Sequence, residues 1–250
     1  MSKRTLICLA AASLLLAPFA EAALVKVQDL VLTADGGFTP RTLPRHAFAP
    51  ISFRGHADVK KTDGSIPPPL QQVVVEFDRD GRLDIAGLPV CDPSLLQEVT
   101  PEEARARCAA AIVGTGHVRV LIAREAGPPY DVAAPLTLFN GPPQGSLPTV
   151  ILHTRTTVPS TQNFVITIPI ERRPGPYRYR ITFDVPPISA GRGSLVHVDV
   201  NIGRRYRFRG APRSYVSARC SDNVLSTRGR FTFADGILID GSVEKACTFR

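Results

Sequence analysis

A short acidic stretch is the first candidate for chemistry in this chain. It contains four carboxylates within nine positions: Glu76, Asp78, Asp80 and Asp84. Carboxylate oxygens are preferred ligands of Ca²⁺, and Gly81 would allow the sharp turn that lets such ligands converge. The spacing therefore predicts a calcium site, although a complete helix–loop–helix site would need a glutamate where the chain has Gly87. The alternative is a hairpin turn at Asp80-Gly81, because Val73–Val75 just before it is typical of a strand.

A dense basic stretch is the second candidate. Its arginines are Arg204, Arg205, Arg207, Arg209 and Arg213. Guanidinium groups bind carboxylates, sulfates and phosphates through paired hydrogen bonds. On a strand, Arg205, Arg207 and Arg209 would share one face, and Tyr206 and Phe208 would share the other face with Arg204. The pattern predicts an anion-binding surface. The alternative is an ordinary solvated strand face, or an edge strand protected by charge.

The chain also contains the residue types of a catalytic triad, in Ser194, His197 and Asp199. A histidine and an aspartate two positions apart on one strand do not form the hydrogen-bonded chain that nucleophilic catalysis needs. No nucleophile elbow, zinc-protease, phosphate-loop or dinucleotide motif is present. No metal-ligand spacing is found among the other histidines, which are His46, His56, His117 and His153. We therefore predict no catalytic residue, and no cofactor other than calcium.

Four cysteines follow the first 22 residues: Cys91, Cys108, Cys220 and Cys247. An even number of cysteines in an exported chain is typical of disulfides, and three pairings are possible. Proximity in sequence favours Cys91–Cys108 and Cys220–Cys247. The alternative, a metal site, would lack the Cys-x-x-Cys pair that structural zinc sites commonly contain.

The N-terminus predicts export. Met1–Arg4 is basic, Leu6–Phe19 is apolar, and Ala20-Glu21-Ala22 is a small-x-small cleavage site, which together form a signal peptide. Cleavage near Ala22 would release a periplasmic, secreted or otherwise extracellular protein without a membrane span, since the apolar run is shorter than about 20 residues. The released chain keeps 28 basic and 21 acidic residues. Export favours an anionic envelope polymer or a glycan, rather than nucleic acid, as the partner of this basic protein.

Alternation of apolar and polar residues predicts strands along most of the chain. The clearest runs are Val25–Thr33, Gln71–Phe77, His117–Ala123, Val150–Thr157, Phe164–Ile170, Tyr177–Asp184, Val196–Ile202, Tyr215–Cys220, Gly229–Ala234 and Ile237–Val243. Turn signals separate them at Asp80-Gly81, Asn140-Gly141 and Asp235-Gly236. We expect an all-β fold, an antiparallel, jelly-roll-like β-sandwich. Residues 23–69 supply N-terminal strands and a proline-rich loop, and 70–250 form the main sandwich, which we expect to make one domain with 23–69.

One short helix is expected within this β protein. Thr100 is suited to the N-cap, Pro101 to the first helical position and Glu103 to the third position of a capping box. The predicted helix covers Pro101–Ala111 and contains Cys108. A bond to Cys91 would tether the helical insertion to the sheet.

Several sequence blocks resemble a family of exported, disulfide-containing, β-rich bacterial proteins of uncharacterised function. The blocks are Gln72–Asp78, Gly87–Cys91, Cys108 with Val113–Gly116, Phe139–Gly141, Tyr215–Cys220 and Phe231–Gly236. The resemblance covers residues from about 70 to the C-terminus. It implies an exported β protein with disulfides, and it brings no activity or catalytic residue.

These observations together predict an exported, non-enzymatic binding or structural module. It would contact anionic cell-envelope components or glycans mainly through the five arginines of the basic stretch. Two alternatives remain open. One is an exported, glycan-directed hydrolase, because glycosidase carboxylates have no local sequence signature. The other is a structural protein stabilised by calcium.

Overall fold

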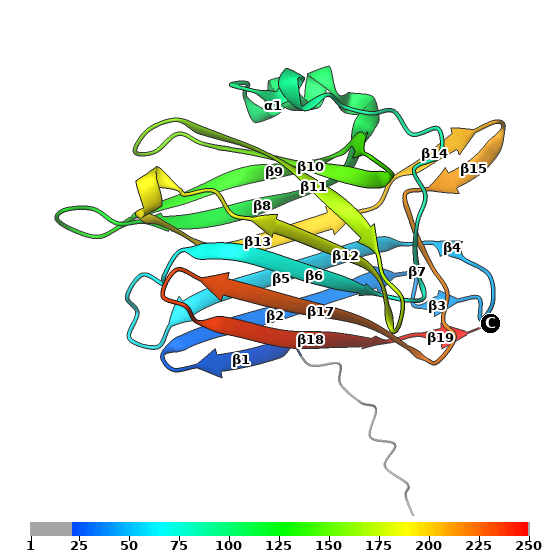
Figure 1. Ribbon diagram of the computed structural model, residues 1–250, viewed down its shortest axis with the longest axis horizontal. Coiled ribbons are helices and arrows are strands. Elements are labelled where there is room, and N and C mark those ends of the chain that lie inside the picture. Colours follow the sequence, from blue (N-terminus) through cyan, green and yellow to red (C-terminus); the bar gives the residue numbers. More distant parts are fainter. Residues whose placement is uncertain (1–21, 250) are drawn as a thin grey trace, which may run out of the picture.

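The computed structural model describes residues 22–249 and confirms the all-β antiparallel class with one short helix (Figure 1). The predicted signal peptide lies outside the described residues, except for Ala22. Twelve strands form one antiparallel sheet. In sheet order they are β1 (Ala23–Val27), β2 (Leu30–Thr39), β5 (Ser52–Lys61), β13 (Gly193–Ile202), β8 (Ile112–Ile122), β9 (Tyr130–Gln144), β10 (Leu147–Thr156), β11 (Gln162–Arg172), β12 (Tyr177–Asp184), β6 (Leu70–Asp78), β17 (Val224–Phe233) and β18 (Leu238–Ala246).

The sheet folds over on itself into two facing layers (Figure 1). Strands β6, β17 and β18 face β5, β2 and β1, and the sheet bends from one layer into the other through β10, β11 and β12. The layers touch through Phe53 of β5 and Phe77 of β6, whose rings meet edge to face with centroids 5.8 Å apart. At the open edge β18 lies beside β1, where a Cβ added to Gly241 would be 3.3 Å from Val25 Cγ2. The two layers of this sandwich are therefore parts of one continuous sheet.

Residue alternation along each strand produces this arrangement. On β13, Val198, Val200 and Ile202 point between the layers, whereas His197 and Asp199 lie on the outer face. A strand places successive side chains on opposite faces, so burial of the apolar set between the layers leaves the polar set in water. Strands β2 and β5 belong to the same sheet as the strands after residue 69.

The helical insertion covers the outside of β9 and β10 (Figure 1). It consists of η1 (Pro93–Leu96), α1 (Pro101–Arg107) and η2 (Ala109–Ala111). The capping box at the start of α1 is confirmed, since Thr100 Oγ1 accepts from the Glu103 N–H at 3.2 Å and Glu103 Oε2 accepts from the Thr100 N–H at 2.8 Å. The α-helix is shorter than predicted, because the chain leaves helical geometry at Cys108 and tightens into a 3₁₀ turn. Among the described helices, none is long and apolar enough to cross a membrane.

Both favoured disulfides are confirmed. Cys91 and Cys108 are bonded with their Cα atoms 5.5 Å apart, and Cys220 and Cys247 are bonded with their Cα atoms 6.0 Å apart. The first bond joins the two ends of the helical insertion, whose Leu96 and Ala104 pack on Phe139 and Ile151 of the sheet. The tether therefore holds an apolar cover against the outer face of β9 and β10.

The three turn predictions have different outcomes. Asp235-Gly236 does join β17 and β18 in a hairpin, with Gly236 at φ 84°. Asn140-Gly141 was the wrong place for a turn, because both residues lie inside β9. There the lack of a side chain on Gly141 allows close packing, since a Cβ would lie 2.3 Å from Thr149 Oγ1.

Asp80-Gly81 lies at a turn but not in a hairpin. The chain turns out of β6 there and enters β7 (Gly81–Leu83), which pairs with β16 (Val216–Ala218) instead of β6. Strand β16 also pairs with β4 (Ala49–Pro50), which completes a three-stranded sheet. The remaining elements are the hairpin β14 (Arg205–Phe208) and β15 (Ala211–Ser214), the parallel pair β3 (Thr42–Leu43) and β19 (Thr248–Phe249), and η3 (Ser189–Gly191).

Candidate functional site

A cavity of about 450 Å³ lies between the two layers of the sheet. Aliphatic and aromatic side chains from both layers form its wall, among them Leu136, Leu152, Phe164, Ile166, Ile181, Phe183, Leu195, Val198 and Val200. Several of these inward-facing side chains, such as Leu152 and Val198, are only half-buried, because they border the cavity. The volume falls within the range of about 300–1,000 Å³ that is usual for small-molecule sites.

The cavity follows from the width of the sheet and the size of its inward residues. Twelve strands enclose a broad interior, and the chain has no tryptophan to fill it. Several wall positions carry very small residues, including Ala34, Ala57, Gly55 and Gly229. Protein interiors normally pack to crystal-like density, so an interior space of this size is an unusual feature of a folded domain.

An ion pair forms part of the cavity wall. Lys245 Nζ on β18 lies 2.5 Å from Asp35 Oδ1 on β2, and the lysine side chain is only 8% exposed. Burial has the largest single effect on the pKa of Asp35 and would raise it, but the hydrogen bonds from Lys245 and from the Gly36 N–H, together with the positive charge of Lys245, outweigh burial and lower that pKa. The pair joins β18 directly to β2 at Asp35, one residue past the point where β1 stops pairing with β2. It therefore helps to close the open edge of the folded sheet.

Two threonines supply a different kind of polar group to the same cavity. Thr154 and Thr156 on β10 both line it and are 7% and 2% exposed. Within residues 22–249, neither hydroxyl oxygen has a hydrogen-bond partner. A buried polar atom without a partner costs free energy, so a hydrogen bond from a bound molecule to either hydroxyl would be favourable.

A smaller cavity of about 170 Å³ adjoins the main one. The two share four wall residues: Leu70, Val185, Ile188 and Leu195. The segment over this smaller cavity contains Ser189 at φ 47° and Ala190 at φ 53°, left-handed conformations that side chains rarely adopt. The Ser189 N–H donates to Gln162 Oε1 at 2.8 Å, which connects the segment to β11 beside the two threonines.

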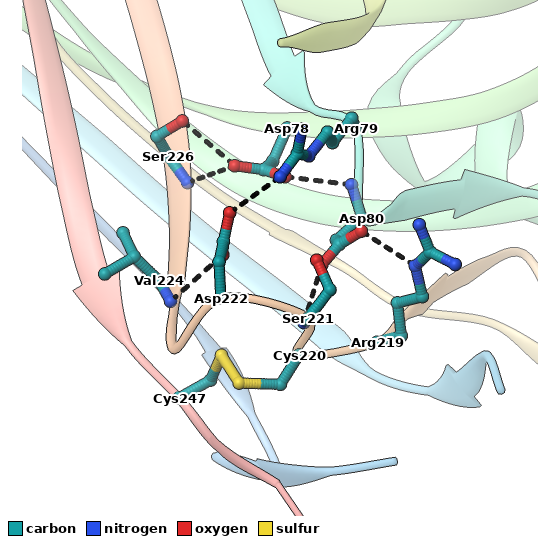
Figure 2. Close-up of polar contacts among 10 residues, drawn as sticks. All are labelled: Asp78, Arg79, Asp80, Arg219, Cys220, Ser221, Asp222, Val224, Ser226 and Cys247. Atoms are coloured by element: carbon teal, nitrogen blue, oxygen red, sulfur yellow. Dashed lines mark hydrogen bonds and ion pairs between the residues drawn. A yellow bond between two sulfur atoms is a disulfide. The ribbon is translucent and has the colours of Figure 1, made fainter. Parts of the chain in front are cut away.

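The four predicted calcium ligands each have a different protein partner. Figure 2 shows that Asp78 accepts from the N–H and hydroxyl of Ser226, at 2.9 and 3.0 Å, and that Asp80 accepts from Arg219 Nε at 2.7 Å. Glu76 accepts from Arg180, and Asp84 accepts from Arg213 at 2.9 Å. Within residues 22–249, no group of three or more His, Cys, Asp or Glu side chains is arranged to hold a metal ion.

Asp80 is the centre of a structural network beside the Cys220–Cys247 disulfide (Figure 2). Its side chain is 1% exposed, and its second oxygen accepts from the Ser221 N–H at 2.8 Å. Burial alone would raise the pKa of Asp80, but the hydrogen bonds from Ser221 and Arg219 outweigh burial and lower that pKa. The carboxylate thus stays ionised and ties the turn after β6 to the segment that enters β17.

The basic stretch forms the β14–β15 hairpin, which projects from one end of the molecule (Figure 1). The predicted alternation is present, since Arg205, Arg207 and Arg209 are exposed while Tyr206 and Phe208 are half-buried. The inner face is anchored, because the Tyr206 hydroxyl donates to the Asp84 carbonyl at 3.1 Å. None of the three exposed arginines has a carboxylate partner among the described residues.

The other two arginines of this stretch lie in a different environment. Arg213 is ion-paired with Asp84, so a residue predicted to bind anions neutralises a residue predicted to bind calcium. Arg204 is half-buried, and its Nε is buried without a hydrogen-bond partner. The structure therefore reduces the accessible basic face to Arg205, Arg207 and Arg209.

The structure contains a second basic cluster, which the sequence did not predict. The guanidinium carbons of Arg82, Arg178 and Arg219 lie 5.4–5.6 Å from the ring centroid of Phe48. These arginines come from three distant segments, so no local run of charge could reveal the cluster. Cation–π contact with one ring stabilises three like charges close together.

The residue types of the triad do not assemble. The Ser194 hydroxyl donates to the Pro67 carbonyl, and His197 Nδ1 lies 2.8 Å from Asp58 Oδ1 on the neighbouring strand. Asp199 instead accepts from the backbone N–H of His117 at 3.1 Å. The three side chains therefore have separate partners.

No family model, curated protein or solved structure matches this chain significantly. The family resemblance of the sequence blocks stays a prediction. Evidence about function therefore comes from the geometry of the cavity and of the hairpin.

Proposed function

We propose that this protein is an exported, non-enzymatic binding protein that holds a small apolar molecule between the two layers of its sheet. The observation that carries the proposal is the cavity of about 450 Å³ with its largely aliphatic and aromatic wall. Apolar cavities exclude water and bind apolar molecules, because water inside them would lose hydrogen bonds. The two disulfides suit an oxidising compartment outside the cytoplasm.

The polar groups of the wall support binding rather than hydrolysis. A glycan hydrolase needs two carboxylates that are free to act on one bond. The carboxylates that border the cavity are Asp35 and Asp78, and they are engaged by Lys245 and Ser226 respectively. The hydrolase alternative stays a prediction without support from this site.

Titration of the oxidised mature protein with N-phenyl-1-naphthylamine, a neutral dye that fluoresces in apolar surroundings, tests the proposal. We expect saturable binding with one dye per chain. Val198→Phe should fill part of the cavity and weaken binding about tenfold or more, because the added ring occupies the space of the dye. Leu152→Phe, from a different strand of the wall, should act in the same way.

Asn201→Phe provides the matched control, since Asn201 is an exposed residue of the same strand, β13. This variant should bind the dye like the wild type. Thermal unfolding of each variant identifies any that fail to fold. Absence of saturable binding in the wild type, or unchanged binding in both folded cavity variants, would refute the proposal.

A second candidate function has its own supporting observation. The exposed arginines of the β14–β15 hairpin have no carboxylate partners in the described chain, whereas several arginines elsewhere are paired, as Arg119 is with Asp131 and Arg180 with Glu76. We propose that this face binds an anionic envelope polymer or an acidic glycan. Such binding is compatible with a ligand in the cavity, because the hairpin projects away from the two layers (Figure 1).

A further inference from the structure

We propose that the ligand of the cavity is an amphiphile with a neutral, hydrogen-bonding headgroup, such as a long-chain alcohol or ester, and that Thr154 and Thr156 bind this headgroup. The inference rests on the proposed binding function and specifies the chemistry of the ligand. Its basis is the pair of buried hydroxyls in an otherwise largely apolar wall.

The two threonines form a built polar site. They are two positions apart on β10, so both side chains project to the same face of the strand. Both are more than nine-tenths buried, and neither oxygen has a hydrogen-bond partner in the described part of the chain. A hydroxyl donates one hydrogen bond and accepts two, and rotation about the Cβ–Oγ1 bond lets its hydrogen point at a neighbouring group. The two side chains together can therefore bind the polar atoms of a ligand's headgroup.

The charges around the threonines favour a neutral headgroup. Arg155 lies between them in sequence but points to the outer face, where its guanidinium donates to the Glu98 carbonyl at 3.2 Å. Lys245 of the cavity wall is already paired with Asp35. Arg82 also borders the cavity, and its guanidinium lies over the Phe48 ring, 5.6 Å from the centroid. An ionised carboxylate placed at Thr154 and Thr156 would thus lack a cation, and burial of an unpaired charge is far more costly than burial of a neutral hydroxyl.

The surroundings also indicate how the ligand lies. Thr154 pairs across the sheet with Phe164 of β11, and Phe164 packs against the apolar cluster that contains Ile188 of the segment over the smaller cavity. Thr156 pairs with Gln162, which accepts the hydrogen bond from Ser189. The headgroup would therefore lie near η3, and the hydrocarbon tail would extend into the main cavity among Leu152, Val198 and Ile181.

The test measures displacement of N-phenyl-1-naphthylamine by n-decane, 1-decanol and decanoate. The variant is Thr154→Val together with Thr156→Val, which keeps the shape of both side chains and removes both hydroxyls. We expect the ratio of decanol affinity to decane affinity to fall about tenfold in this variant, since each neutral hydrogen bond contributes a few-fold to affinity. Dye binding should persist. Decanoate should compete more weakly than decanol in the wild type.

Thr137→Val is the matched control. Thr137 on β9 is also fully buried with an unpartnered hydroxyl, but it does not line the cavity. This variant should keep the wild-type ratio. An unchanged ratio in the double variant, with dye still bound, would overturn the headgroup inference and leave the proposed function intact. Stronger competition by decanoate would overturn the neutral headgroup, and failure of the dye to bind the wild type would overturn both proposals.

Discussion

At the scale of single residues, partners and burial decide which charged groups are available for function. Asp80 is enclosed and bonded to Arg219 and Ser221, so its charge stabilises a turn. Asp84 and Arg213 neutralise each other at 2.9 Å. Arg205 has the same chemistry as Arg213 but is exposed to water, without a carboxylate partner among the residues that the structure describes. Residues of the same type thus have different roles because their surroundings differ.

His153 provides a prediction at this scale. Its side chain is fully buried between β10 and the helical insertion, and burial, with a smaller contribution from Arg155, lowers its pKa below the ordinary 6.5. The unfolded chain therefore binds a proton at higher pH than the folded protein. The resulting stability is fully present above about pH 6.5 and is lost as the pH falls toward the lowered folded-state value.

We expect the urea midpoint of the wild type to decrease from pH 7 to pH 5, and His153→Leu to reduce that decrease. His117→Leu is the control, because the His117 side chain is 70% exposed. This variant should keep the wild-type change in urea midpoint between pH 7 and pH 5. Equal pH dependence in the wild type and His153→Leu would show that His153 does not couple protonation to folding.

At the scale of elements, the β14–β15 hairpin separates an anchored face from an exposed one. Phe208 packs where Gly87 has no side chain, since a Cβ there would lie 1.9 Å from Phe208 Cδ2. The two residues at its tip, Arg209 and Gly210, both have positive φ, which suits a two-residue hairpin loop. A firmly anchored inner face keeps the outer arginines in a regular array.

The hairpin predicts salt-sensitive binding to an anionic polymer, for which immobilised heparin is a suitable probe. Replacement of Arg205, Arg207 and Arg209 by Gln should lower the salt concentration needed for elution, because exposed ion contacts are screened by salt. Replacement of Arg124, Arg172 and Arg192 by Gln removes the same charge from exposed sites elsewhere. A similar loss in both triple variants would mean that net charge, rather than the hairpin, determines binding.

At the scale of the whole molecule, one folded sheet both encloses the interior cavity and brings its two edge strands together. The two layers meet at β1 and β18, the Lys245–Asp35 pair joins β18 to β2, and β3 pairs with β19. The Cys220–Cys247 bond lies next to this closure, whereas Cys91–Cys108 holds the helical insertion. The disulfides thus stabilise two separate regions.

We expect Cys91→Ala/Cys108→Ala and Cys220→Ala/Cys247→Ala each to lower the free energy of unfolding by about 3 kcal/mol, because each bond closes a loop of moderate length. Treatment of the wild type with EDTA should leave the unfolding temperature unchanged, since Asp78 and Asp80 are held by protein donors. Urea and thermal unfolding measure both effects. A marked destabilisation by EDTA would instead support the calcium prediction.

The sequence by itself determined what depends on nearby residues. Alternation predicted the strands, the capping residues predicted the start of α1, and cysteine spacing favoured the correct pairs. It misplaced a turn at Asn140-Gly141, because a glycine needed for close packing resembles a glycine needed for a turn. Only the tertiary structure decided the pairing of Asp84 with Arg213, the arginine cluster around Phe48 and the cavity beside Thr154. These features join segments far apart in the chain, so they depend on how the sheet folds over and not on local periodicity.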